Sequence, residues 1–229
     1  MAKRARQMHF DEIRDRGRWG GRRERAGRRP RSGGRGVTHG ARPDFSGREP
    51  AMITWKLVEG IPSLRRRRAV RALREVIRAV RERRGFRVVH YSIQGDHLHL
   101  VVEADGRAAL SNGLNALGAR LARRVSRIFA RRGRVFRERY CMRVLRSPRE
   151  VRHALAYVLN NARKHGALRV PGIDPASSGC FLRHWSRVVR NPRGRPGDPE
   201  VVRARSWLLR VGWQRWGKAD PAYVPSAGR

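Results

Sequence analysis

Two short runs around a tight turn constrain the fold of this chain more than any other feature of its sequence. Residues 86–93 are rich in β-branched and aromatic side chains, and Gln94-Gly95-Asp96 favours a turn. The next residues alternate between polar and apolar types, which places Leu98, Leu100 and Val102 on one face of a strand. This pattern predicts a β-hairpin with one face in the core.

Helical and extended patterns before and after the hairpin predict the rest of the fold. The expected elements are a strand at 52–58, a helix capped by Ser63 and ending near Gly85, the hairpin, a helix at 108–130, a strand at 135–145 and a helix at 147–165. The last helix begins with the capping box Ser147-Pro148-Arg149-Glu150. The fold class is therefore α+β, a ferredoxin-like β-α-β-β-α-β antiparallel sheet with an additional C-terminal helix.

The charge of the chain indicates a polyanionic partner. Lys and Arg number 55 against 18 Asp and Glu, a formal charge of +37, and all but four of the cations are arginine. Arginine binds phosphate in a bidentate manner, so nucleic acid is the expected partner, although a GC-rich genome would also enrich arginine. We expect a basic tail at 1–48, a folded domain at 49–168 and a basic extension at 169–229, without a membrane span, in the cytoplasm.

His97 and His99 are the first candidates for chemistry. They are two residues apart on the predicted strand, so both imidazoles project from the face opposite Leu98 and Leu100. Two neutral imidazoles side by side can bind one divalent cation. Two surface histidines on an exposed sheet face are the plainer alternative for this motif alone.

The last predicted helix carries a second group of candidates. Its apolar stripe is formed by Val151, Leu155, Val158 and Ala162. Tyr157 falls away from this stripe, and Asn161 follows one turn later on the same side. A half-buried surface tyrosine is the alternative to a functional one.

Together these residues resemble the single-tyrosine HUH transposases, in particular the REP-associated tyrosine transposase branch. The resemblance rests on His97-Leu98-His99 and on the run from Tyr157 to Gly166, and it covers residues 50–166. Ala162 departs from the pattern, because many relatives have proline there. We expect alanine to keep the helix intact and to leave the chemistry unaffected.

The resemblance implies a mechanism and a partner. His97, His99 and Asn161 would ligate Mg²⁺ or Mn²⁺, and Tyr157 would attack the scissile phosphate to form a 5′-phosphotyrosine. The substrate would be single-stranded or hairpin DNA in a bacterial nucleoid. Relatives include homodimers and monomers, so both states stay open. DNA-binding candidates are the basic residues of the second helix, the last strand and the third helix, namely Arg120, Arg124, Arg137, Arg139, Arg143 and Lys164.

Three other functions fit parts of the pattern. A ferredoxin-like sheet with arginines is also the plan of non-catalytic RNA-recognition domains, but their aromatic signature is missing from the strand with His97 and His99. Replication initiators and relaxases share the histidine pair but often use two tyrosines or place the tyrosine earlier. A domesticated transposase would carry the same residues.

The C-terminal tryptophans Trp207, Trp213 and Trp216 favour a small apolar cluster over base stacking.

Overall fold

The computed structural model describes residues 45–168, 172–188, 191–192 and 198–225. The predicted basic tail at 1–48 lies outside the described residues except for 45–48, where Phe45 is buried in the core. Within the described residues, no helix combines the length and the apolar character needed to cross a membrane.

The centre of the fold is a five-stranded antiparallel sheet. Its strands are β1 (Ala51–Lys56), β2 (Glu82–Arg83), β3 (Phe86–Ile93), β4 (His97–Ala104) and β5 (Cys141–Val144), in the order β2-β3-β4-β1-β5. The predicted hairpin is present as β3 and β4, joined at Gln94-Gly95-Asp96. The α+β, ferredoxin-like prediction is confirmed.

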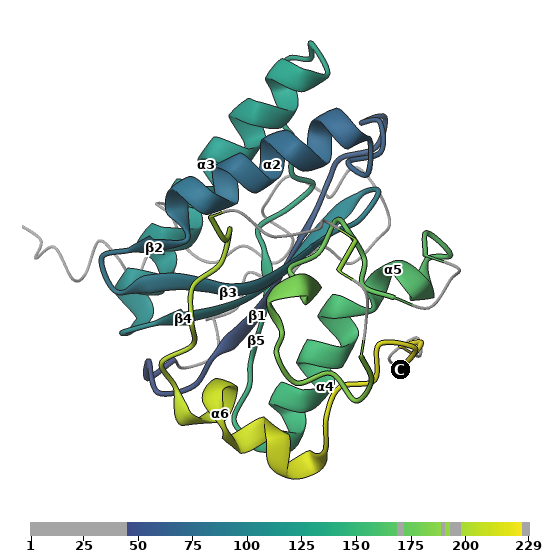
Figure 1. The fold of residues 1–229 in the computed structure, drawn as a ribbon. Coiled ribbons are helices and arrows are strands. Elements are labelled where there is room, and N and C mark those ends of the chain that lie inside the picture. The colour runs from purple at the N-terminus through teal and green to yellow at the C-terminus, as the bar shows by residue number, and fades with distance from the viewer. Residues whose placement is uncertain (1–44, 169–171, 189–190, 193–197, 226–229) are drawn as a thin grey trace, which may run out of the picture. The chain divides into compact units, whose positions relative to one another are not determined.

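Two helices cover one face of the sheet. Helices α2 (Arg67–Val80) and α3 (Arg107–Ile128) bury their apolar stripes against the face that carries Leu98, Leu100 and Val102 (Figure 1). The packing is close at Gly113, where an added Cβ atom would lie 2.1 Å from the ring of Phe86. Any side chain at this position would therefore separate α3 from the sheet.

The predicted start of α2 was wrong. The helix begins at Arg67, and Arg66 is its N-cap, without a side-chain hydrogen bond to the helix. Ser63 instead accepts from the backbone N–H of Arg65 at 3.2 Å, which stabilises the preceding turn. The helix also ends at Val80, because β2 and the left-handed residues Arg84 and Gly85 turn the chain into β3.

The predicted strand at 135–145 was too long. Regular pairing with β1 is confined to Cys141–Val144, and Phe136 forms only an isolated bridge with Leu57. Arg137 and Arg139 therefore lie outside β5 on exposed chain. Tyr140 packs edge-on against Trp55, which holds this irregular segment against the core.

A second apolar layer covers the other face of the sheet. Helix α4 (Pro148–Leu159) packs there with α6 (Trp207–Arg210) and the 3-10 helix η2 (Gly212–Trp216) (Figure 1). The predicted capping box is present, since Ser147 accepts from the N–H of Glu150 at 3.2 Å and Glu150 accepts from the N–H of Ser147 at 3.1 Å. The helix ends at Leu159 and not near His165, because Asn160 breaks it before the short helix α5 (Asn161–Lys164).

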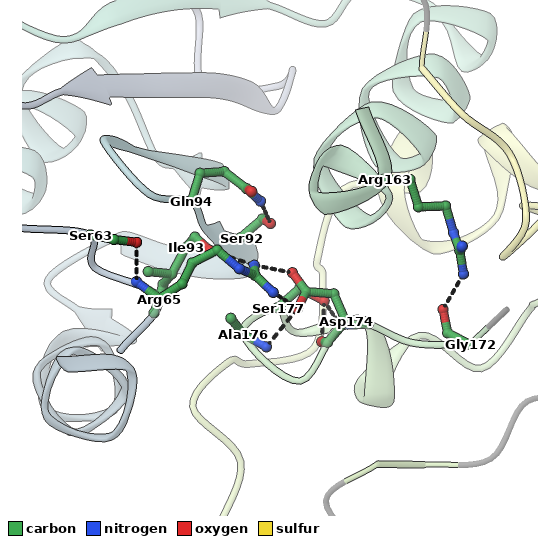
Figure 2. A network of polar contacts seen from close by, with 11 residues as sticks. Ser63, Arg65, Ser92, Ile93, Gln94, Arg163, Gly172, Asp174, Ala176 and Ser177 are labelled. Carbon is green, nitrogen blue, oxygen red and sulfur yellow. Dashed lines mark hydrogen bonds and ion pairs between the residues drawn. The ribbon is translucent and has the colours of Figure 1, made fainter. Parts of the chain in front are cut away.

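The chain after α5 returns to the sheet. The backbone N–H of Ile93 donates to Ala176 and that of Ser178 to Tyr91, at 3.0 and 2.9 Å, along the edge of β3 beyond β2. Arg65 forms two hydrogen bonds with buried Asp174, at 2.8 and 2.9 Å (Figure 2). This segment therefore pairs an edge that would otherwise be open.

Candidate metal and nucleophile site

The register of the sheet places several polar side chains on the face under α4. His99 is paired with Thr54 of β1 on one side and with Ser92 of β3 on the other. Since cross-strand partners point to the same face, these side chains and His97 share the α4 side. The rings of His97 and His99 are 4.7 Å apart between centroids.

Asp96 orients the imidazole of His97. Its Oδ1 atom lies 2.7 Å from Nδ1 of His97, so that nitrogen carries a hydrogen, and in the neutral imidazole Nε2 has a free lone pair. Partial burial acts to raise the pKa of Asp96, but the hydrogen bond and charge of His97 outweigh it, and the pKa is lowered. Asp96 was expected to stabilise the turn, and in the structure it also positions a candidate ligand.

Burial keeps His99 neutral. Desolvation, followed by the nearby charges of His97, His165 and Lys164, lowers its pKa to about 3. Its Nδ1 lies 2.9 Å from the Thr54 hydroxyl, while its Nε2 is buried without a hydrogen-bond partner. When Nδ1 donates to Thr54, Nε2 presents a lone pair inside the site.

Asn161 brings an amide to the same place. Its Oδ1 atom lies 3.3 Å from Nε2 of His97, and its fully buried Nδ2 has no partner. With the hydrogen of a neutral His97 on Nδ1, both facing atoms are acceptors, an arrangement that a cation beside them would stabilise. Two imidazole nitrogens and an amide oxygen form a donor set suited to a divalent metal, so these residues fit Mg²⁺ or Mn²⁺.

The site differs from the more usual metal clusters in its composition. Among the described residues, no group of three or more His, Cys, Asp or Glu side chains is arranged to hold a metal. Asn161 would therefore be needed to complete a three-ligand set with His97 and His99.

Tyr157 lies beside these residues in the same chain. Its ring is 5.2 Å from that of His99 between centroids, in an edge-to-face arrangement. The Nζ atom of Lys164 is 5.2 Å from the centre of the tyrosine ring, so a cation faces the phenol from α5. Tyr157 is half-buried and faces the histidines, which agrees with its predicted position outside the main apolar stripe.

The C-terminal residues hold the α4–α5 break in place. The side-chain amide of Asn160 donates to the carbonyl of Asp220 at 3.0 Å. Arg163 donates to the carbonyl of Pro221 at 2.8 Å and to that of Gly172 at 2.9 Å; Figure 2 shows the second of these contacts. Because Asn161 lies between these two anchors, its position depends on chain that follows the helix by more than 50 residues.

The predicted DNA-binding residues lie in three different places. Arg143 is on the α4 face of β5, 3.3 Å from Glu150, whereas Lys164 is in the site itself. Arg120 and Arg124 belong to α3 on the opposite side of the sheet, where Arg124 lies 3.5 Å from Glu75. Arg137 and Arg139 are exposed beyond the end of β5. The structure therefore does not gather all six around the histidines.

Sequence reasoning noted His165 only as part of a basic flank, missed Thr54 and misjudged Glu103. The ring of His165 is 5.1 Å from that of His97, and Thr54 bonds His99. Burial, together with the charges of His97 and Lys164, lowers the pKa of His165. The sequence places Glu103 on the strand face of the two histidines, where a solvent-facing glutamate was favoured over a partner for an imidazole. In the structure Glu103 is buried and accepts from the backbone N–H groups of Arg205 and Ser206 at 2.7 and 2.8 Å. The signal for His165 in the sequence was the polar, basic flank that it forms with Lys164 after Tyr157 and Asn161.

The three tryptophans do not form the single cluster that the sequence favoured. Trp213 is buried in the second apolar layer, as a small cluster requires, and its indole donates to the carbonyl of Leu209 at 3.0 Å. Trp207 and Trp216 are 49% and 54% exposed, so a cluster of all three was wrong.

Comparison with known proteins links the region of this site to one family. Residues 62–161 match the family model described as "Transposase IS200 like". The structure is similar, with a TM-score of 0.47 and 17% identity, to a REP-associated tyrosine transposase bound to a REP hairpin, over 58% of this chain and 76% of that one. It is also similar to a candidate transposase of Deinococcus radiodurans, with a TM-score of 0.36 and 19% identity, over 49% of this chain and 84% of that one. No curated protein matches the sequence.

Proposed function

We propose that this chain, whose residues 62–161 match the IS200-like transposase model, cleaves and rejoins single-stranded DNA with Tyr157 as its nucleophile. The observation that carries the proposal is the convergence of Tyr157, His97, His99 and Asn161 within one chain. The 5.2 Å separation between the rings of Tyr157 and His99 supports use of the tyrosine by its own subunit.

The proposed reaction consists of two balanced transfers. The Tyr157 oxygen attacks the scissile phosphorus, an O–P bond to tyrosine forms, and the bond from phosphorus to the 3′ oxygen breaks. The phenolic proton is lost and the leaving 3′ oxygen gains one, which yields a 5′-phosphotyrosine and a free 3′-hydroxyl. Attack by a 3′-hydroxyl then reverses these changes and rejoins the strand, so no nucleotide cofactor is consumed.

The residues around the tyrosine have separate roles in this proposal. His97, His99 and Asn161 would hold Mg²⁺ or Mn²⁺, which when bound stabilises charge on the phosphate oxygens. Asp96 and Thr54 orient the two imidazoles through their Nδ1 atoms. The ammonium group of Lys164 faces the ring of Tyr157 and adds positive charge beside the proposed nucleophile.

The substrate in this proposal is hairpin or palindromic DNA. The REP hairpin in the related structure suggests this class, and the excess of arginine over acidic residues suits a phosphate backbone. Binding to phosphates is independent of the histidines, so a loss of cleavage need not be accompanied by a loss of affinity.

The test is a cleavage assay on end-labelled, hairpin-forming single strands of palindromic sequence. We expect a protein–DNA adduct that resists denaturation with Mg²⁺ or Mn²⁺ and disappears with EDTA. Tyr157→Phe should abolish the adduct, and His97→Ala or His99→Ala should reduce it strongly while sparing DNA affinity. Tyr223→Phe is a matched control, because Tyr223 is an exposed tyrosine near the C-terminus. An adduct that persists in Tyr157→Phe would exclude this nucleophile.

A further inference from the structure

A row of exposed side chains leads along α4 away from the tyrosine. Arg149, His153 and Tyr157 are spaced by four residues, so they lie on one side of the helix. Arg149 and His153 are exposed and Tyr157 is half-buried. Eight residues at about 1.5 Å each put Arg149 about 12 Å from Tyr157 along the helix axis.

The far end of this row meets an exposed tryptophan. The guanidinium of Arg149 lies over the ring of Trp216, with Cζ 5.5 Å from its centroid. Trp216 is 54% exposed although it ends η2, which is anchored in the second apolar layer by buried Trp213. An aromatic ring held at the surface, with a cation on one side, is a suitable platform for a nucleobase.

The position of Trp216 is held by α4 itself. Arg152 donates to the carbonyls of Gly217 and Lys218 at 3.3 and 3.5 Å, which fixes the chain immediately after the tryptophan. Figure 1 shows the segment from α6 lying along the part of α4 that is distant from α5. The ring is therefore presented at a defined distance from the tyrosine.

The charge around Trp216 suits a polyanion. Residues 210–218, on either side of Trp216 in the sequence, contain the cationic residues Arg210, Arg215 and Lys218 and no acidic residue. The acidic residue near Arg149, Glu150, is engaged by Arg143 and by the capping box. An aromatic surface in a basic surrounding favours single-stranded nucleic acid over an apolar protein partner.

We propose that Arg149, His153 and Trp216 form a track along α4 that binds single-stranded DNA extending from Tyr157, with a base stacked on Trp216. This inference rests on the proposed cleavage function. The distance of about 12 Å corresponds to about three or four nucleotides at the B-form rise of about 3.4 Å, and to fewer in an extended strand. The stacked base would thus lie a few nucleotides from the scissile phosphate, outside the cleavage site.

The experiment measures binding and cleavage separately. In the Tyr157→Phe background, Trp216→Ala should weaken the affinity for a fluorescein-labelled, mixed-sequence single strand of about 20 nucleotides roughly tenfold, and Trp216→Phe should retain most of it. Arg149→Met should reduce the slope of log affinity against log salt by about 0.7. With Tyr157 present, Trp216→Ala should raise the half-saturating DNA concentration and leave the maximal rate of adduct formation unchanged.

Trp207→Ala is the matched control. Trp207 is 49% exposed and has Arg215 5.1 Å from its ring centroid, but it is not paired with an exposed residue of the Tyr157 row. An equal loss of affinity in Trp207→Ala and Trp216→Ala would overturn the track, as would unchanged affinity in Trp216→Ala. A change of oligomeric state in Trp216→Ala with DNA affinity intact would assign the surface to a second copy instead.

These outcomes distinguish the two proposals. If the unsubstituted protein binds single strands but forms no adduct, the cleavage function fails while the binding comparison still tests the track. If adducts form with the same half-saturating DNA concentration in Trp216→Ala, the track fails and the cleavage function stands.

Discussion

The side-chain amide of Asn160 donates to the backbone carbonyl of Asp220 across 3.0 Å, which ties the break between α4 and α5 to the C-terminal segment. Asn160 is nearly fully buried. Removal of its side-chain amide would deprive the backbone carbonyl of Asp220 of this hydrogen bond. The adjacent residue is Asn161, a proposed metal ligand. The C-terminal segment therefore contributes to the geometry of the site without supplying a ligand.

Asn160→Ala should weaken both the fold and the site. Loss of this hydrogen bond is expected to lower the free energy of unfolding by about 1–2 kcal/mol and to slow cleavage at limiting Mn²⁺. Denaturant unfolding and the adduct assay measure the two effects. Asn112→Ala, at an exposed position of α3, is the control and should change neither. A normal Mn²⁺ requirement in Asn160→Ala would show that the anchor does not position Asn161.

Thr54→Val should weaken metal binding. The substitution preserves the size of the side chain but removes the hydroxyl 2.9 Å from Nδ1 of His99, so the ring loses its orienting partner. Removal of a residue that hydrogen-bonds a metal-ligating histidine typically lowers metal affinity by about 10–100-fold. We expect the Mn²⁺ concentration for half-maximal cleavage to rise by that factor, whereas Thr54→Ser should stay close to the unsubstituted protein. If valine and serine variants behave alike, the hydroxyl has no part in the site.

Glu103→Gln should destabilise the protein without a direct effect on the site. The buried carboxylate accepts from the N–H groups of Arg205 and Ser206, and charged acceptors form the stronger hydrogen bonds. A loss of about 1–3 kcal/mol in unfolding free energy is expected. Glu59→Gln, an exposed carboxylate just after β1, is the matched control. Equal stability of the two variants would contradict the role of Glu103 as an anchor.

The stability of the fold should fall in mild acid because of His90. Burial lowers the pKa of His90 to about 4, against about 6.5 in the unfolded chain. Between these values the unfolded chain binds the proton and the folded chain does not, so stability present above pH 6.5 is lost as the pH falls towards 4. The largest loss from this group is about 3 kcal/mol.

His90→Gln should therefore flatten the pH dependence in that window. Unfolding by urea at pH 7, 5.5 and 4.5 measures the free energy of unfolding. The stability of His90→Gln relative to the unsubstituted protein should rise as the pH falls. His153→Gln is the control, since His153 is exposed. An equal pH slope for His90→Gln and the unsubstituted protein would exclude His90 as the source.

Local spacing was sufficient for much of the fold. The hairpin follows from two adjacent runs and a short turn, and the shared face of His97 and His99 and the capping box each depend on residues within three positions of each other. Local spacing did not determine which face of β3 His90 occupies. A register shift between Val88 and His90 turns His90 to the α4 face, whereas Val88 faces the main core. The alternation of side chains along a strand gives no indication of where such a bulge occurs.

The amino-acid sequence by itself determined the order of the elements, the histidine pair and the tyrosine helix, because each is a periodic pattern read over one or two turns. Only the tertiary structure decided that Nε2 of His97 meets Oδ1 of Asn161, 64 residues away, and that Glu103 and Asn160 are buried beneath the C-terminal segment. Those contacts depend on how the layers pack and where the chain returns, and packing between distant segments leaves no fixed spacing in a single sequence.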